Sequence, residues 1–139
     1  MRPDRSERSR ESPVARGTIS KVAFGGSGLG TLPDGKVCFV PGVIPGEVAT
    51  VRILKQKKSY AEGVVETLHE VSPQRVKPPC PVAGVCGGCQ YQHIAYPLQL
   101  EIKRSQVAEV LSRIGGLENP PVHPTAPSPQ EFAYRNRIT

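Results

Sequence analysis

Proline and glycine limit what this chain can fold into. The 139 residues include 15 prolines and 14 glycines, and both residue types interrupt helices and the interiors of strands. This composition argues against long helical bundles and coiled coils. Apolar residues make up 37% of the chain and aromatic residues 5%. We therefore expect a small core built mainly from Val, Ile, Leu and Ala.

The first half of the chain predicts a small β-barrel. Short runs rich in β-branched residues are separated by turn signals such as Gly25-Gly26-Ser27-Gly28 and Pro33-Asp34-Gly35. Turns at this spacing are typical of a sandwich or barrel, and a five-stranded barrel of the OB type closes its edges within this length. We expect the barrel to span residues 13–72, with strands at 14–24, 29–32, 36–40, 46–54 and 60–68.

The second half predicts one helix between irregular segments, so the fold class is α+β. Residues 1–12 are polar and without period, and we expect a disordered tail there. We interpret 73–96 as a cysteine-rich loop, 97–116 as a helix, and 117–139 as a loop followed by the truncated start of a further domain, whose first strand opens at Phe132. The expected apolar face of the helix comprises Leu100, Val107, Leu111 and Ile114.

Positive charge points to a polyanionic partner. The formal net charge is +6, and four cations fall within seven residues of the expected barrel. A solvated surface loop is an equally weighted alternative for such a cluster. An aromatic residue that follows the cluster, and another in the glycine loop, can stack on unpaired bases. The candidate RNA-binding residues are Arg52, Lys55, Lys57, Lys58, Tyr60 and Phe24.

Three cysteines within ten residues indicate a metal centre. Cys80, Cys86 and Cys89 follow the spacing C-x5-C-x2-C, which suits an iron–sulfur cluster or a zinc site. We rank an iron–sulfur cluster with its fourth ligand beyond residue 139 first, a zinc site second and disulfides third. Cys38 lies in an expected strand, where a free cysteine is usually a small core residue. His93 is an alternative ligand, although a lone histidine is more often polar surface.

The expected location is the cytoplasm. Residues 1–13 are charged and lack the apolar segment of a secretory signal. No stretch approaches the 18 apolar residues of a membrane span, so we expect no membrane partner. Cytosolic cysteines are kept reduced, so we also expect no disulfide partner.

Four stretches of the sequence carry a resemblance to a known family. Residues 80–111, CPVAGVCGGCQYQHIAYPLQLEIKRSQVAEVL, resemble the cluster segment of the RNA uracil-C5 methyltransferases. The runs ARGTISKVAFGGSGLG and GKVCFVPGVIPGE are similar to the TRAM domain of that family, and the YRNR near the end resembles the motif that opens its central domain. The resemblance implies that Cys80, Cys86 and Cys89 are three ligands of a [4Fe-4S] cluster, with the fourth ligand further downstream.

The resemblance also implies that these residues do not catalyse methyl transfer by themselves. In the family, the C-terminal half binds S-adenosylmethionine and carries both the cysteine nucleophile and the base, and this chain has no counterpart of it. We therefore expect an RNA-binding, cluster-bearing N-terminal portion that is not catalytic by itself. The resemblance is strongest to the 23S rRNA uracil-5-methyltransferases, which favours ribosomal over transfer RNA. The alternatives are a stand-alone RNA-binding TRAM protein and a zinc-stabilised interaction module.

Overall fold

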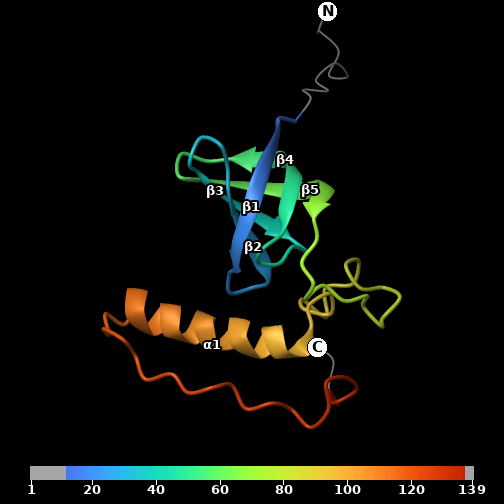
Figure 1. Cartoon of the computed structure of the whole chain (residues 1–139), viewed down its shortest axis with the longest axis vertical. Coiled ribbons are helices and arrows are strands. Elements are labelled where there is room, and N and C mark those ends of the chain that lie inside the picture. Colours follow the sequence, from blue (N-terminus) through green and yellow to red (C-terminus); the bar gives the residue numbers. More distant parts are fainter. Residues whose placement is uncertain (1–11, 137–139) are drawn as a thin grey trace, which may run out of the picture.

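The computed structural model describes residues 12–136, which form a closed β-barrel, one helix and two irregular segments (Figure 1). The strands follow the order β1-β2-β3-β5-β4 around the barrel. All neighbours are antiparallel except β3 and β5, which run parallel. The expected five-stranded barrel with a single helix is confirmed. The strands are β1 (Val14–Val22), β2 (Ser27–Thr31), β3 (Val37–Pro41), β4 (Val48–Gln56) and β5 (Tyr60–Glu70).

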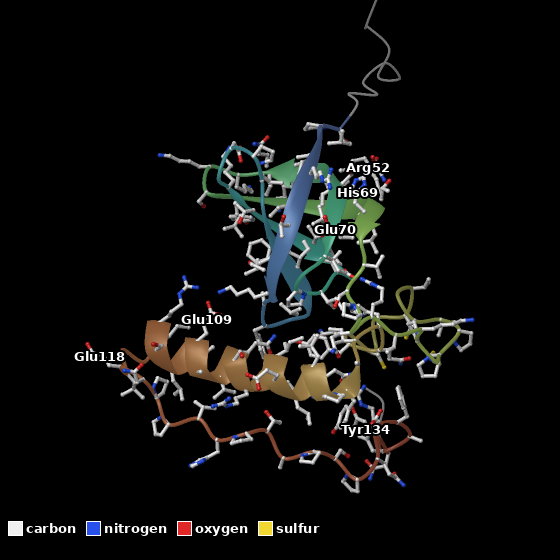
Figure 2. The ribbon with its side chains drawn as sticks, in the orientation of Figure 1. Arg52, His69, Glu70, Glu109, Glu118 and Tyr134 are labelled. Atoms are coloured by element: carbon white, nitrogen blue, oxygen red, sulfur yellow. The ribbon has the colours of Figure 1, made fainter. Side chains whose placement is uncertain are left out.

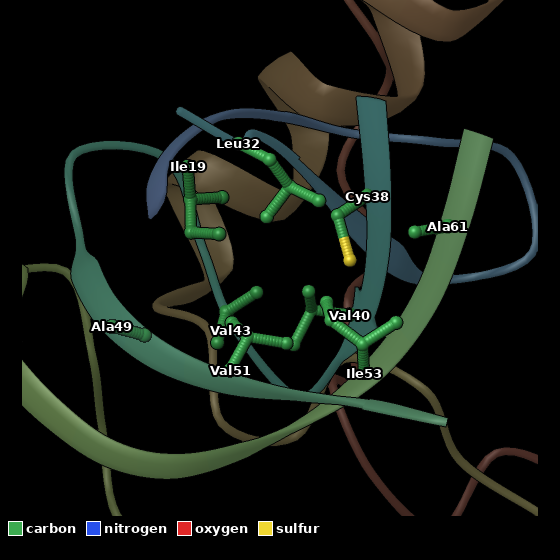
Figure 3. Packing of buried hydrophobic residues seen from close by; sticks show 9 residues of the cluster. All are labelled: Ile19, Leu32, Cys38, Val40, Val43, Ala49, Val51, Ile53 and Ala61. Atoms are coloured by element: carbon green, nitrogen blue, oxygen red, sulfur yellow. The ribbon is translucent and has the colours of Figure 1, made fainter. Parts of the chain in front are cut away.

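The barrel interior is small and aliphatic, as the composition indicated. Alternate residues of β4 point inward, so that Ala49, Val51 and Ile53 are buried while Arg52 between them is exposed. The expectation that Cys38 is a core residue is confirmed, since it is fully buried in β3. Figure 3 shows the cluster, which consists of Ile19, Leu32, Cys38, Val40, Val43, Ala49, Val51, Ile53 and Ala61.

Two glycines inside strands allow the barrel to close tightly. A Cβ atom built on Gly28 would lie 2.4 Å from Val43 Cγ2, and one on Gly63 would lie 2.4 Å from Val51 Cγ1. Neither separation is possible between real atoms without movement, so β2 and β5 come this close to their neighbours only because they lack side chains there.

A bulge in β1 joins the barrel to the rest of the molecule. The register between β1 and β2 shifts between Ile19 and Lys21, which interrupts the alternation of inward and outward side chains. Ile19 therefore packs inside the barrel, whereas Val22 packs outside it against Ile44, Ile94 and Ile102. This second cluster holds the helix against the end of the barrel.

Helix α1 (Tyr96–Arg113) begins with Pro97 in its first turn and is followed by Gly115 and Gly116. The expected apolar face is wrong as the packing face, since Val107 is 51% and Ile114 84% exposed. Ile102 is instead the buried residue of the helix. The contact with β1 is completed by polar groups, because Gln106 donates to the Val22 carbonyl (3.1 Å) and Glu109 pairs with Lys21 (2.5 Å).

Residues 117–136 run back along α1 as an extended strap (Figure 1). Arg104 Nε donates to the Val122 carbonyl (3.1 Å), Thr125 Oγ1 donates to the Leu100 carbonyl (2.8 Å), and the Ser128 N–H donates to the Tyr96 hydroxyl (2.7 Å). The strand expected to open at Phe132 is absent from residues 132–136, because no neighbouring strand lies beside this segment to pair with it.

Residues 1–11 and 137–139 lie outside the described residues, including nearly all of the expected tail. Within 12–136, no helix has the length and apolarity needed to cross a membrane.

Candidate nucleic-acid interface and cysteine loop

The β4–β5 hairpin brings five of the six candidate RNA-binding residues together. Arg52 and Lys55 point outward from β4, where Arg52 pairs with Glu66 (3.2 Å) and Lys55 with Glu62 (3.9 Å) across the hairpin. Exposed pairs of this kind contribute about 0–1 kcal/mol. They do, however, neutralise half of the four-cation cluster, so the hairpin carries less free positive charge than its sequence indicated.

The turn of the hairpin carries the unpaired part of that charge. Lys57 and Lys58 are exposed, and neither forms an ion pair with any residue in the described range 12–136. Tyr60 follows them directly and packs edge-on against Phe39 of β3, with ring centroids 5.7 Å apart and an interplanar angle of 89°. Two free ammonium groups beside an outward-facing aromatic pair can contact phosphates and a base at the same time.

Phe24 lies apart from that turn, on the β1–β2 loop. This loop is at the end of the barrel next to α1, whereas the β4–β5 turn lies towards the other end (Figure 1). Phe24 is 88% exposed and lines a cleft of about 450 Å³ between the barrel and the C-terminal half of the helix. The structure therefore divides the candidate RNA-binding residues between two sites.

The three cysteines of the expected cluster lie on one irregular loop, shown in yellow-green beside the barrel in Figure 1. All are free thiols, with Cys86 and Cys89 exposed and Cys80 half-buried. The Gly88 N–H donates to Cys86 Sγ (3.4 Å). A Cβ atom on Gly87 or Gly88 would meet nothing closer than that sulfur, at 3.4 Å. The loop thus leaves open space beside its thiols, into which a metal group could fit.

The cysteine side chains are not gathered around one point. Within residues 12–136, no three His, Cys, Asp or Glu side chains are close enough together to hold a metal ion. The thiols present fit the donor chemistry of iron–sulfur or zinc centres. Binding such a group would require the loop to close around it.

Comparison with known proteins assigns the barrel to a family. Residues 14–65 match the TRAM domain family, and these residues cover all but the end of the five-stranded barrel. Residues 14–65 form a TRAM domain.

The matches extend beyond the TRAM domain. A protein of Gloeobacter violaceus named as an uncharacterized RNA methyltransferase is 45% identical over 121 residues, which are 87% of this chain and 26% of that protein. An Aquifex aeolicus protein of the same description is 42% identical over 121 residues, covering 87% of this chain and 28% of that protein. The chain thus spans about a quarter of the length of these curated relatives. The expected relation to RNA methyltransferases is confirmed, and the choice of ribosomal RNA stays a prediction.

A solved structure is also similar. The crystal structure of the Pyrococcus abyssi tRNA (uracil-54, C5)-methyltransferase in complex with S-adenosyl-L-homocysteine is 34% identical, with a TM-score of 0.47. The match covers 70% of this chain and 21% of that one.

A buried ion pair fastens the cysteine loop to the TRAM domain. The Glu47 carboxylate is fully buried. It accepts hydrogen bonds from Arg75 Nε (2.6 Å) and from Arg75 Nη2 (2.7 Å). It also accepts from the N–H groups of Ile44 (3.0 Å) and Ser72 (3.4 Å). Burial by itself raises the pKa of Glu47, but the Arg75 contacts and the two N–H bonds outweigh it, so the pKa is lowered.

The two ends of the cysteine loop are held together next to this pair. Arg75 and Ile94 form an antiparallel bridge, the Val76 N–H donates to the His93 carbonyl (3.0 Å), and the Ala95 N–H donates to the Gln74 carbonyl (2.8 Å). Burial, reinforced by the nearby Arg75 charge, lowers the pKa of His93. Its buried Nε2 has no partner within residues 12–136, while a hydrogen bond with the Val43 backbone favours the charged ring. The alternative that His93 is a metal ligand stays a prediction.

Sequence patterns indicated neither Glu47 nor Arg75. Glu47 follows the apolar turn Val43-Ile44-Pro45-Gly46, and an acidic residue between an apolar turn and an apolar strand was the available signal. Its partner is 28 residues away, so no local pattern could pair them.

Proposed function

We propose that this chain is an RNA-binding portion of an S-adenosylmethionine-dependent RNA uracil-C5 methyltransferase. The observation that carries the proposal is the turn of a TRAM barrel that presents Lys57 and Lys58 without ion-pair partners in the described residues, next to Tyr60. The names of the relatives support the methyltransferase part. The chain spans about a quarter of these relatives, and the family resemblance implies that the methyl donor and the catalytic groups belong to the part it does not span. We therefore propose RNA binding, and not methyl transfer, as the role of the residues described here.

Charge removal at the turn tests RNA binding. We expect Lys57→Ala with Lys58→Ala to weaken binding to single-stranded and duplex RNA alike and to lower the salt slope by about 1–2, as loss of two phosphate contacts requires. Fluorescence anisotropy with labelled RNA over a range of salt measures both quantities. Lys77→Ala with Lys103→Ala is the matched control, because it removes the same charge elsewhere on the surface. Equal effects of the two double variants would contradict the proposal.

The target that we propose is ribosomal RNA, on the basis of the family resemblance of residues 80–111. Anisotropy competition between unlabelled 23S rRNA fragments and unlabelled transfer RNA tests it. Tighter binding of transfer RNA at equal salt would overturn this assignment while leaving RNA binding intact.

We further propose that Cys80, Cys86 and Cys89 hold a [4Fe-4S] cluster. The support is three free thiols on one loop with open space beside Gly87 and Gly88. Three thiolates leave one iron open to water or an added thiol, so occupancy in this chain should be labile to oxygen. Bound to these thiols, a cluster would supply a structural cross-link, since methyl transfer to uracil needs no electron.

Metal analysis tests the cluster. Protein reconstituted anaerobically should be brown and contain iron and sulfide, and each of Cys80→Ser, Cys86→Ser and Cys89→Ser should lower both contents. Cys38→Ser is the control, because this buried thiol lies inside the barrel. Stoichiometric zinc with sulfur ligation in protein isolated anaerobically from iron-replete cells would favour the zinc site instead.

A further inference from the structure

The cleft between the TRAM domain and α1 is lined by apolar side chains from both. Phe24, Leu29 and Phe39 come from the barrel, and Val110 and Ile114 come from the last turn of the helix and the residue after it. Its volume of about 450 Å³ falls within the roughly 300–1,000 Å³ typical of sites for small ligands.

The rim of this cleft exposes two large apolar side chains. Phe24 is 88% and Ile114 84% exposed, and neither belongs to the two core clusters. The loop that presents Phe24 is a tight turn, in which the Ala23 N–H donates to the Ser27 carbonyl (2.8 Å) and the Gly26 N–H donates to the Ala23 carbonyl (3.0 Å). Gly25 and Gly26 have positive φ angles, 98° and 96°. The backbone of this turn is therefore fixed, and it presents Phe24 outside the two core clusters.

Positive charge borders the cleft. Lys21 of β1 and Arg113 of α1 both pair with one carboxylate, that of Glu109, at 2.5 and 2.9 Å. Two positive charges and one negative charge leave a net charge of about +1 at the rim. Figure 2 shows Glu109 on the face of α1 that is turned towards the barrel. Arg113 lines the cleft and binds Glu109 through Nη1, which leaves its other N–H groups for an anionic ligand.

The cleft is continuous with the hairpin that carries the free lysines. Leu29 pairs in register with Phe39 across β2 and β3, and Phe39 in turn contacts Tyr60. These three outward-facing residues, here called the outer strip, connect the cleft to the Lys57–Lys58 turn. Flat apolar surface with cations at both ends is the arrangement that binds single-stranded nucleic acid, where aromatic rings take bases and cations take phosphates.

We propose that the cleft binds one unpaired base of single-stranded RNA, stacked on Phe24, while the adjoining nucleotides follow the outer strip towards Lys57 and Lys58. The inference rests on the proposed RNA-binding function and adds where an unpaired base is held. An apolar peptide would fit the cleft itself but would leave the cations at the two ends of the strip without a counterpart.

Two substitutions at exposed positions test the cleft in the full chain. Phe24→Ala should weaken binding of a short fluorescein-labelled single-stranded RNA about 5- to 150-fold, the effect of losing one base–aromatic stack. Ile114→Ala should weaken it in the same direction. Binding of the matching duplex and the salt slope should stay unchanged, since no phosphate contact is lost. The control is Tyr134→Ala, an exposed aromatic on the strap whose label in Figure 2 lies towards the opposite end of α1 from Glu109.

Failure of the cleft and failure of RNA binding can be told apart. If the unmodified chain binds RNA and Phe24→Ala binds single strands equally well, the cleft inference is wrong and the proposed function stands. An equal loss for single strands and duplex would also overturn it, because the cleft would not then distinguish an unpaired base. If the unmodified chain binds no RNA at low salt, both fail. A dimer that Phe24→Ala abolishes, with RNA affinity unchanged, would make a second copy the occupant and overturn the inference.

Discussion

At the scale of single residues, Glu47 is the group on which most of the junction between barrel and cysteine loop depends. Its carboxylate is completely buried and receives four hydrogen bonds, two of them from Arg75. A buried carboxylate is tolerated only when it is paired, and removal of its partner leaves an uncompensated charge.

We expect Arg75→Met to destabilise the protein by about 3 kcal/mol, the lower end of the range for breaking a buried pair, because Arg75 keeps some exposure to water. Urea unfolding of the two proteins measures the difference. In the double variant Glu47→Gln with Arg75→Met no charge is buried, so much of the stability should return. A single variant as stable as the parent would show that the pair contributes nothing.

The same junction predicts loss of stability in acid, in two steps. His93 is kept neutral by burial, so its folded pKa lies below its ordinary value of 6.5. The unfolded chain therefore binds the proton first, and stability falls as the pH drops from about 6.5 towards the folded pKa. Glu47 has a pKa below its ordinary 4.5, so its contribution is complete above that value and is lost as the pH falls through the folded pKa.

Urea titrations at a series of pH values check these steps. In His93→Leu the loss of stability at the higher pH should disappear, and the loss at the lower pH should remain. In Glu47→Gln the loss at the lower pH should disappear, and the loss at the higher pH should remain. If His93→Leu retains the decline that begins near the ordinary histidine pKa of 6.5, the titrating group is a different one.

At the scale of elements, strand β5 can pass over β4 only at a glycine. A Cβ on Gly63 would lie 2.4 Å from Val51 Cγ1 and 2.7 Å from the Arg52 carbonyl oxygen, and the backbone oxygen cannot move aside as a side chain can. Gly63→Ala should therefore cost about 1–3 kcal/mol, as overpacking of a core does. Gly87→Ala is the control, since its Cβ would meet nothing within 4 Å. Thermal unfolding followed by circular dichroism compares the two.

Helix α1 shows how periodicity alone can select the wrong face. Leu100, Val107, Leu111 and Ile114 recur at helical spacing, yet the buried residue is Ile102. The barrel-facing side relies on Gln106 and Glu109, which bind the Val22 carbonyl and Lys21. Hydropathy patterns do not register contacts of that kind, so the orientation of the helix could not be predicted from them.

At the scale of the whole molecule, the barrel and its junction form the smallest unit that we expect to fold. The barrel core is complete within residues 12–72, but Arg75 lies just beyond it. We expect a fragment of residues 12–78 to give dispersed amide NMR signals without metal. A fragment of residues 12–72 should be markedly less stable, because Glu47 is then buried without its partner. Random-coil spectra for both fragments would show that the barrel depends on α1 and the cysteine loop.

Local sequence patterns were enough to predict the strands and the helix of this protein. Turn residues at regular spacing predicted the five strands, and the position of Cys38 in an expected strand predicted that it is a core residue. These features are local, because they follow from backbone geometry and from which side chains avoid water.

Which of these residues contact one another depends on the folded arrangement of the chain. It paired Arg52 and Lys55 with carboxylates of β5 and left Lys57 and Lys58 without such partners in the described residues. It also placed Phe24 at the rim of the cleft between the barrel and α1, and it joined Glu47 to Arg75. Each of these outcomes depends on strand register, on a bulge or on contacts between residues far apart in the chain. Such contacts form only when the barrel closes, so no local pattern encodes them.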